Sequence, residues 1–189
     1  MQPEPLPHAA IRPYPTQYVW KWKLKDGTAV TIRPIRPEDE PLMVQFHSTL
    51  SERSVYLRYF GWLSLSTRVE HERLMRVCSG SYDHGFALVA DRTSPETEQH
   101  EILGLGRFSA IDHAEAEAAV LISDQWQGRG LGSELLARVV WVARAEKFKK
   151  LSAEILRDNL VTQAIFKKVG FKLRTMEDDP SSVSAVLEL

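Results

Sequence analysis

The spacing of apolar residues changes several times along the chain, and each spacing predicts a different element. Near the start, aromatic and β-branched residues alternate with polar ones over Tyr18–Leu24 and again over Ala29–Arg33. Asp26-Gly27 lies between these two runs, and an Asp-Gly pair between alternating segments is typical of a hairpin turn. The first predicted element is therefore a β-hairpin.

Apolar residues take up helical spacing in the next stretch. Pro37 and the three acidic residues after it are typical of a helix start, and Ser and Thr are preferred as helix caps. Three helices are therefore expected: Pro37–Leu50, a second from the cap Ser51 to Phe60, and a third from Ser66 or Thr67 to about Cys78.

Short apolar runs separated by turn signals dominate the second half of the chain, and they predict strands. Positions 91–100, which are polar and contain a proline, are expected to form a loop, and Asn159–Val169 is expected to form a helix. This order of elements predicts a mixed α/β sheet in one domain. The expected strands are Phe86–Ala90, Glu101–Phe108, Ala116–Ser123, Leu151–Leu156, Phe171–Arg174 and Val183–Leu189.

Length and composition agree with a single domain. The chain has 189 residues, of which 43% are hydrophobic and 26% charged, and this is enough for a sizeable core. Residues 1–16 contain five prolines and little pattern. We therefore expect a flexible leader over residues 1–16 and the folded domain over residues 17–189.

Charge and cysteine content exclude several classes of protein. A formal net charge of -1 provides no general attraction for nucleic acid or a membrane surface, and every apolar run is shorter than the roughly 20 residues of a spanning helix. The N-terminus lacks the basic and apolar regions of a signal peptide. Cys78 is the only cysteine, and the six histidines lack metal-ligand spacing. We expect a cytoplasmic protein with no metal and with neither nucleic acid nor membrane as a partner.

The glycine-rich segment Gln127–Ser133 is the most informative motif. It follows the apolar run Ala118–Ile122 and precedes an amphipathic stretch, which is the order strand, turn, helix. Such a turn aims backbone N–H groups and the positive end of a helix dipole at one point, where a phosphate is stabilised. The segment therefore predicts a site for a pyrophosphate-bearing cofactor. The apolar positions of the helix are Leu131, Leu135, Leu136, Val139, Val140 and Ala143.

Three phosphate-binding motifs can be compared with this spacing. A P-loop needs a lysine directly after its glycines, and none follows here. A dinucleotide-binding fingerprint needs G-x-G-x-x-G near the first strand, whereas Gly128-x-Gly130-x-Gly132 lies two-thirds along the chain. The pattern [QR]-x-x-G-x-[GA] between a strand and a helix is matched in full by residues 127–132.

That last pattern is the acetyl-CoA signature of the GNAT acetyltransferases, which this chain resembles. A second GNAT block is similar to the helix that begins at Asn159 and ends in Lys168-Val169-Gly170-Phe171. The resemblance implies acetyl-CoA as cosubstrate. It also implies the GNAT fold, a mixed, largely antiparallel sheet flanked by helices.

A closer resemblance covers nearly the whole chain and is to the GNAT domain of the bacterial protein lysine acetyltransferases called Pat. It implies a protein Nε-lysine acetyltransferase that acts on acyl-CoA synthetases, and leaves monomer and homodimer open. In many relatives the domain is fused to an acyl-CoA synthetase-like region. The segment Arg12–Pro15 resembles the tail of that region. The segments that carry the resemblance are Leu24–Thr28, Thr31–Glu40, Leu50–Phe60 and Trp126–Gly128.

Acetyl transfer to lysine needs a neutral amine, although the lysine pKa is about 10.4, so a nearby carboxylate can serve as base. In the Pat resemblance this base is the Glu of an A-E-F-A-V block at the start of a strand. Ala116–Val120 matches that block, which implies Glu117 as the base, with Ala118 in place of the family's Phe. Glu115 lies on the same face of the strand and is the reserve candidate. Without the resemblance, both are read as solvated acids at a strand end.

The resemblance also implies a set of cofactor-binding residues. Backbone N–H groups near Leu121 or Ile122 would bind the thioester oxygen and the pantetheine arm, and Asn159 would bond the same arm. Asn159 has a second interpretation as a plain helix cap. Phe166 stands where many GNAT enzymes have a general-acid Tyr, and is expected to pack against the cofactor arm while water protonates the thiolate. The remaining expected cofactor residues are Ser123, Gln127, Gly128, Arg129 (or a solvated loop arginine), Gly130, Leu131, Gly132 and Ser133.

Two other functions remain open from the sequence. A small-molecule amine acetyltransferase would have the same fold and cofactor site and differ only in the acceptor groove. A non-catalytic acetyl-CoA-binding regulatory module would explain the Phe166 position, whereas a Glu at the base position speaks against it.

Overall fold

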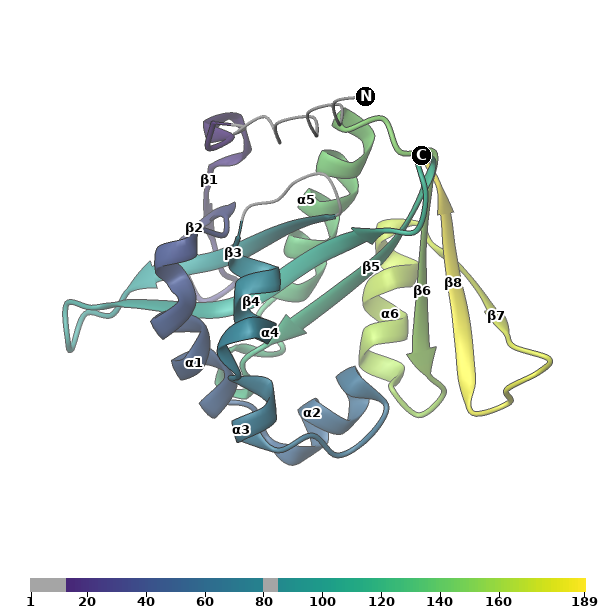
Figure 1. Ribbon diagram of the computed structural model, residues 1–189, viewed down its shortest axis with the longest axis horizontal. Coiled ribbons are helices and arrows are strands. Elements are labelled where there is room, and N and C mark those ends of the chain that lie inside the picture. Colours follow the sequence, from purple (N-terminus) through teal and green to yellow (C-terminus); the bar gives the residue numbers. More distant parts are fainter. Residues whose placement is uncertain (1–12, 80–84) are drawn as a thin grey trace, which may run out of the picture.

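Eight strands form one open sheet in the computed structural model, which describes residues 13–79 and 85–189 (Figure 1). The strand order is β1-β2-β3-β4-β5-β6-β8-β7. Among these described strands, β5 and β6 pair parallel and all other neighbours pair antiparallel. The strands are β1 (Trp20–Lys23), β2 (Ala29–Pro34), β3 (Gly85–Thr93), β4 (His100–Ala110), β5 (Glu115–Ile122), β6 (Lys150–Leu156), β7 (Lys172–Thr175) and β8 (Ser182–Glu188).

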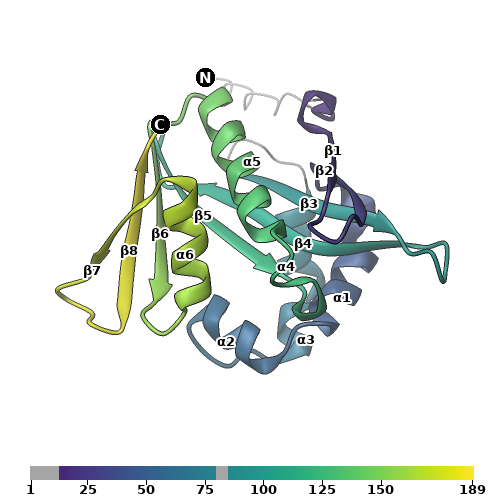
Figure 2. The ribbon, with the colours of Figure 1, turned by 180° about the vertical axis from the view of Figure 1, so that it is seen from behind.

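Helices cover both faces of the sheet. Four short helices lie on one face, and two longer ones cover the other, which faces the viewer in Figure 2. The four are α1 (Glu40–Ser48), α2 (Glu52–Tyr59), α3 (Leu65–Arg68) and α4 (His71–Cys78), and the two are α5 (Leu131–Ala145) and α6 (Leu160–Val169). This architecture confirms the predicted mixed, largely antiparallel sheet flanked by helices.

Most predicted elements appear within a few residues of their expected bounds, but two differ. The third predicted helix is two helices. Ser64 caps the first of them by accepting a hydrogen bond from the Thr67 N–H, and the chain turns again at Glu70 before α4. The predicted loop 91–100 is shorter, because β3 and β4 continue their ladder to the pair Thr93↔His100. Of the predicted leader, residues 1–12 lie outside the described residues, and the Tyr14 hydroxyl donates to the Pro34 carbonyl at 2.9 Å.

Strand β5 separates two apolar cores and so determines which side chains face which helices. Ala118 and Ile122 pack with α5 and α6, whereas Leu121 packs with α1 and α4. Because successive side chains of a strand point to opposite faces, Glu117 and Ala119 lie on the same face as Leu121. The candidate base therefore faces the layer of α1–α4. In α5, all six positions predicted to be apolar and inward-facing are buried.

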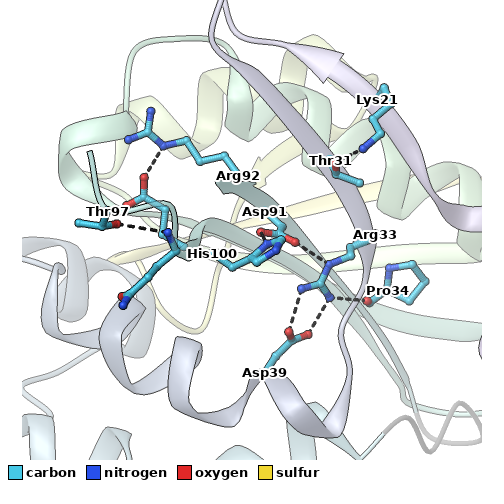
Figure 3. Close-up of polar contacts among 11 residues, drawn as sticks. Lys21, Thr31, Arg33, Pro34, Asp39, Asp91, Arg92, Thr97 and His100 are labelled. Atoms are coloured by element: carbon cyan, nitrogen blue, oxygen red, sulfur yellow. Dashed lines mark hydrogen bonds and ion pairs between the residues drawn. The ribbon is translucent and has the colours of Figure 1, made fainter. Parts of the chain in front are cut away.

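A buried ionic cluster joins β2, β3 and the turn before α1 (Figure 3). The Arg33 guanidinium donates two hydrogen bonds to the Asp39 carboxylate, at 2.7 and 2.8 Å, and one to Asp91 at 2.9 Å. Burial alone would lower the pKa of Arg33, but these hydrogen bonds and the two negative charges raise it above its usual range. His100 contacts the other oxygen of Asp91 at 2.9 Å. This cluster attaches the layer of α1–α4 to the sheet.

Candidate functional site

The sheet opens between β5 and β6 directly after Glu117. The two strands form a parallel ladder at Glu115↔Lys150, Ala116↔Leu151 and Glu117↔Ser152. Beyond Glu117, β5 runs on to Ile122 without a further β6 partner among the described residues, and Figure 1 shows the two strands diverging. The edge of β5 near Leu121 and Ile122 therefore faces a gap in the ladder, where backbone groups can pair with an extended ligand.

The two candidate carboxylates at this opening differ in their partners. Glu115 forms an ion pair with the Lys150 ammonium at 2.8 Å, and the hydrogen bond between them raises the pKa of Lys150. Glu117 is exposed, and within residues 13–79 and 85–189 no cationic side chain lies at ion-pair distance from it. Its cross-strand neighbours are Ser109 and Ser152. Glu117 is therefore the carboxylate that can accept a proton from a ligand at the opening.

The glycine turn has the backbone that an anion site requires. Gly128 and Gly130 have φ of 73° and 89°, in the left-handed region that glycine enters without steric cost. Of the side chains that the structure describes, none caps the first turn of α5. A Cβ built on Gly128 would meet nothing within 4 Å, so the space beside the turn is open. Free N–H groups, a helix dipole and open space fit a phosphate group.

Gly132 and Ser133 occupy the first turn of α5 with Leu131. Leu131 is buried in the core, and Ser133 is half-buried. Gly132 allows α5 to approach α6, because a Cβ at this position would lie 2.9 Å from the Ile165 Cδ1 atom. The three glycines therefore have different roles: two set the backbone of the turn, and one sets the distance between two helices.

The side chains of the turn attach it to its surroundings. The Gln127 amide donates to the Ile122 carbonyl at 3.1 Å and to the Ser54 hydroxyl at 3.2 Å. Arg129 forms an ion pair with Asp26 at 2.5 Å, and its guanidinium lies 4.6 Å from the centre of the Trp126 ring. Arg129 is thus half-exposed but held by the β1–β2 turn, rather than free in solvent.

Three other predicted cofactor residues have partners within the protein. Ser123 is buried, with its hydroxyl 2.8 Å from that of Thr49. Asn159 caps α6 by accepting a hydrogen bond from the Thr162 N–H at 3.2 Å, while its amide nitrogen has no acceptor among the described residues. Phe166 is only 1% exposed, and its ring contacts Phe171 edge to face at 4.7 Å. Contact of Phe166 or Asn159 with a cofactor stays a prediction.

Asp124 is a residue of this region that the sequence did not indicate. Its carboxylate accepts hydrogen bonds from the backbone N–H and the hydroxyl of Ser51, at 2.9 and 2.6 Å, and from the Ser54 hydroxyl at 3.0 Å. It therefore holds the N-terminus of α2 against the end of β5. Ser51, expected to cap α2, does so by accepting from the Ser54 N–H at 3.2 Å.

A pocket of about 410 Å³ lies between the sheet and the layer of α1–α4 and was also not predicted. Five arginines contribute to its lining, and no described Asp or Glu does. The Arg58 and Arg73 guanidinium groups lie 5.3 and 5.2 Å from the centre of the Tyr59 ring. No local motif marks this pocket, because four separate elements supply its arginines, which are Arg58 of α2, Arg68 of α3, Arg73 and Arg76 of α4, and Arg107 of β4.

The described residues form neither a metal-binding cluster nor a membrane-spanning helix. No group of three or more His, Cys, Asp or Glu side chains there is arranged to hold a metal ion. In the same part of the chain, no helix has both the length and the apolar character needed to cross a membrane. Cys78 is fully buried, and burial raises the pKa of its thiol to about 12.

Comparison with known families agrees with this geometry. The family model of the acetyltransferase (GNAT) domain matches residues 29–172, which is more than half of the chain. The chain therefore belongs to the GNAT acetyltransferase family.

Individual relatives refine that placement. Acetyltransferase PA5475 of Pseudomonas aeruginosa is 29% identical over 165 residues, which are 87% of this chain and 86% of that protein. Acetyltransferase Pat of Mycolicibacterium smegmatis is 27% identical over 164 residues, 86% of this chain but only 45% of Pat, so this chain spans less than half of Pat.

Solved structures show the same fold. The GNAT domain of S. lividans PAT superposes with a TM-score of 0.83 at 25% identity, covering 94% of this chain and 100% of that domain. The PaiA N-acetyltransferase of Thermoplasma acidophilum, solved in complex with coenzyme A, superposes with a TM-score of 0.66 at 18% identity. The superposition covers 86% of this chain and 100% of the PaiA chain. The predicted resemblance to the GNAT domain of Pat is thus confirmed.

Proposed function

We propose that this protein transfers the acetyl group of acetyl-CoA directly to the Nε atom of a lysine on another protein, with Glu117 as the general base. One observation carries the proposal: β5 and β6 diverge directly after Glu117. An exposed carboxylate without an ion-pair partner among the described residues therefore stands beside an open strand edge. That edge leads within a few residues to the glycine turn.

The residues of the turn and of β5 fit acetyl-CoA. Backbone N–H groups of residues 127–133, with the positive end of α5, would hold its pyrophosphate, because the turn offers open space and an uncapped helix start among the described residues. The open edge near Leu121 and Ile122 would pair with the pantetheine arm, as would the amide nitrogen of Asn159, which has no acceptor in the described part of the chain. The bound cosubstrate supplies a thioester carbonyl beside Glu117.

The reaction then divides between main chain and side chain. Glu117 accepts the proton of the lysine amine, directly or through one water, as the amine nitrogen bonds to the thioester carbon. Backbone N–H groups near Leu121 and Ile122 donate to the carbonyl oxygen while negative charge develops there. The carbon–sulfur bond then breaks, and coenzyme A leaves as its thiolate. Water protonates the thiolate, because Phe166 has no proton to donate.

The acceptor class rests on the resemblance to Pat. That family implies a protein lysine and nominates acyl-CoA synthetases as substrates. The named relative Pat and the structural similarity to the GNAT domain of S. lividans PAT support this assignment. A small-molecule amine and a purely regulatory acetyl-CoA site are the alternatives that an experiment must separate.

The decisive test is the substitution Glu117→Gln, with Glu115→Gln as the matched control two residues away. Loss of the base should lower kcat by about 10²- to 10⁴-fold, the range typical of general-base removal. Calorimetric affinity for acetyl-CoA should not change, and the control should keep its turnover. Persistent turnover in Glu117→Gln would show that the base assignment is wrong. Binding of acetyl-CoA by the wild type without transfer to any protein or amine would instead favour the regulatory function.

A further inference from the structure

The arginine-lined pocket begins beside Glu117. Ser109, the cross-strand partner of Glu117, and Ala119, two residues further along β5, both line it. The same face continues to Arg107, which pairs with Ala119 across the ladder. A ligand whose reacting atom lies at Glu117 therefore has this pocket directly next to it.

Among the described residues, no carboxylate forms an ion pair with the arginines of the pocket, although the charge of Glu117 acts on Arg58. Arg58, Arg73 and Arg107 have no carboxylate within ion-pair distance among residues 13–79 and 85–189. Burial and the neighbouring charge of Arg107 lower the pKa of Arg58 below its usual range. Arg68 is buried and donates to two carbonyl groups, that of His47 at 2.7 Å and that of Leu63 at 3.1 Å. Guanidinium groups held together in this way favour an anionic ligand.

His47 is a second and independent sign of a ligand. It lines the same pocket and is 4% exposed, yet its Nδ1 atom is buried without a hydrogen-bond partner among the described residues. Burial and the charges of Arg68 and Arg73 lower the pKa of His47 to about 4, so the ring is neutral at physiological pH. Buried polar atoms are normally satisfied, and those that are not often mark a position filled by a ligand or water.

We infer that this pocket binds a carboxylate of the acceptor, so that the preferred substrate is a protein lysine with an Asp or Glu close to it. The inference rests on the proposed function, because it names the acceptor class of the same site. Guanidinium groups bind carboxylates through paired, charge-assisted hydrogen bonds. The same positive charges disfavour the ammonium form of a lysine beside Glu117, which is the form that must lose its proton.

The test uses two peptides that differ only in Glu or Gln beside the target lysine. With the wild-type protein and acetyl-CoA, kcat/KM should be about ten-fold higher for the Glu peptide, which corresponds to about 1.4 kcal/mol. The preference should fall as salt is added, because partly exposed charges are screened. The variants Arg73→Gln and Arg107→Gln should lose most of it, mainly by slowing the Glu peptide. Arg53→Gln, an exposed arginine of α2 outside the pocket lining, is the matched control and should keep it.

A binding measurement separates recognition from chemistry. The same two peptides with norleucine in place of lysine should bind in the same order by calorimetry, Glu before Gln. Urea unfolding of each variant shows whether it folds, and His47→Leu provides a further pocket variant if one arginine variant does not. Equal kcat/KM for the two peptides, or an equal loss for both in Arg73→Gln, would overturn the inference.

Two other outcomes identify which proposal fails. Acetylation of free amino carboxylates but of no peptide would overturn the lysine assignment and support the carboxylate pocket. Preference for a carboxylated acyl donor such as succinyl-CoA over acetyl-CoA, with no preference between peptides, would overturn the inference, because the carboxylate would then belong to the donor. Loss of acetylation of every acceptor by the Glu117→Gln variant would support the proposed function and would leave the carboxylate inference unaffected.

Discussion

The glycine turn and the arginine pocket both lie near the end of β5, where Ala119, Val120 and Leu121 line the pocket, yet they are built in different ways. The turn presents main-chain N–H groups, positive φ angles and a helix start, all supplied by one short segment. The pocket presents side-chain charge, supplied by α2, α3, α4 and β4. A cofactor common to a whole family can be bound by backbone, whereas an acceptor peculiar to one enzyme needs side chains that can vary.

The two helical layers also differ in how far polar side chains attach them to the rest of the protein. Helix α5 is attached to the sheet by an apolar face of buried Leu and Val residues. The layer of α1–α4 depends in addition on polar attachments, namely Arg33 to Asp39, Arg68 to the His47 carbonyl, and Asp124 to Ser51. If this contrast is correct, polar substitutions should affect the acceptor side more than the cofactor side.

The largest effect on stability should come from Asp39→Ala. It removes one of the two carboxylates that bind buried Arg33. Breaking a buried ion pair costs about 3–5 kcal/mol, because a charge is left without its partner. Urea unfolding should show this loss, and Glu38→Ala, an exposed acid one residue earlier, is the control. A loss no larger than that of the control would mean that the cluster does not hold the α1–α4 layer.

The stability of the protein should depend on pH through His47. Its pKa is about 4 in the folded protein against 6.5 for an unperturbed histidine, so the unfolded state binds more protons between these values. The free energy of unfolding should therefore fall as pH drops from about 6.5 towards 4, by at most about 1.4 kcal/mol per pH unit from this group. Comparing unfolding at pH 7 and pH 5 in wild type, His47→Leu and the exposed control His113→Gln measures it. The difference in unfolding free energy between the two pH values should become smaller only in His47→Leu. An unchanged difference in that variant would contradict the low pKa of His47.

Gly130→Ala separates backbone strain from loss of the phosphate site. A left-handed φ costs a residue with a Cβ about 1–2 kcal/mol. The substitution therefore either lowers the stability of the fold or changes the backbone conformation of the turn. Gly27→Ala in the β1–β2 turn is a matched control with the same φ of 89°. Both variants should lose similar stability, but only Gly130→Ala should weaken acetyl-CoA binding, by about ten-fold or 1.4 kcal/mol. Equal affinities in the two variants would contradict a cofactor role for the turn.

The smallest effect tests the connection between the two regions. Asp124→Ala removes the hydrogen bonds that hold the start of α2 against β5, and should cost about 1 kcal/mol of stability. Because α2 carries Arg58, the acceptor KM should rise while acetyl-CoA affinity by calorimetry does not change. Asp124→Asn, which keeps one acceptor oxygen, should recover part of the loss. Equal changes for both substrates would show that the turn itself depends on Asp124.

Local patterns were enough to predict most of the fold. The hairpin, the helix capped by Ser51 and the amphipathic helix after the glycine turn all follow from residues close in sequence, and the structure confirms them. The split of the third helix was missed because the cap was expected at Ser66 or Thr67, whereas Ser64 caps α3 and the extended backbone of Glu70 separates α3 from α4. The β3–β4 ladder extended beyond its prediction because pairing with a neighbouring strand overrides the local preference of polar residues for a loop.

By itself, the sequence determined the elements, the glycine turn and, through resemblance, the family and the position of Glu117, because each of these depends on neighbouring residues or on a contiguous motif. Only the tertiary structure decided which of the two carboxylates is paired, since Glu115 binds Lys150 from another strand. It alone also revealed the Arg33 cluster and the arginine pocket, whose members lie tens of residues apart. Charges interact through space, and their distances exist only once the chain has folded.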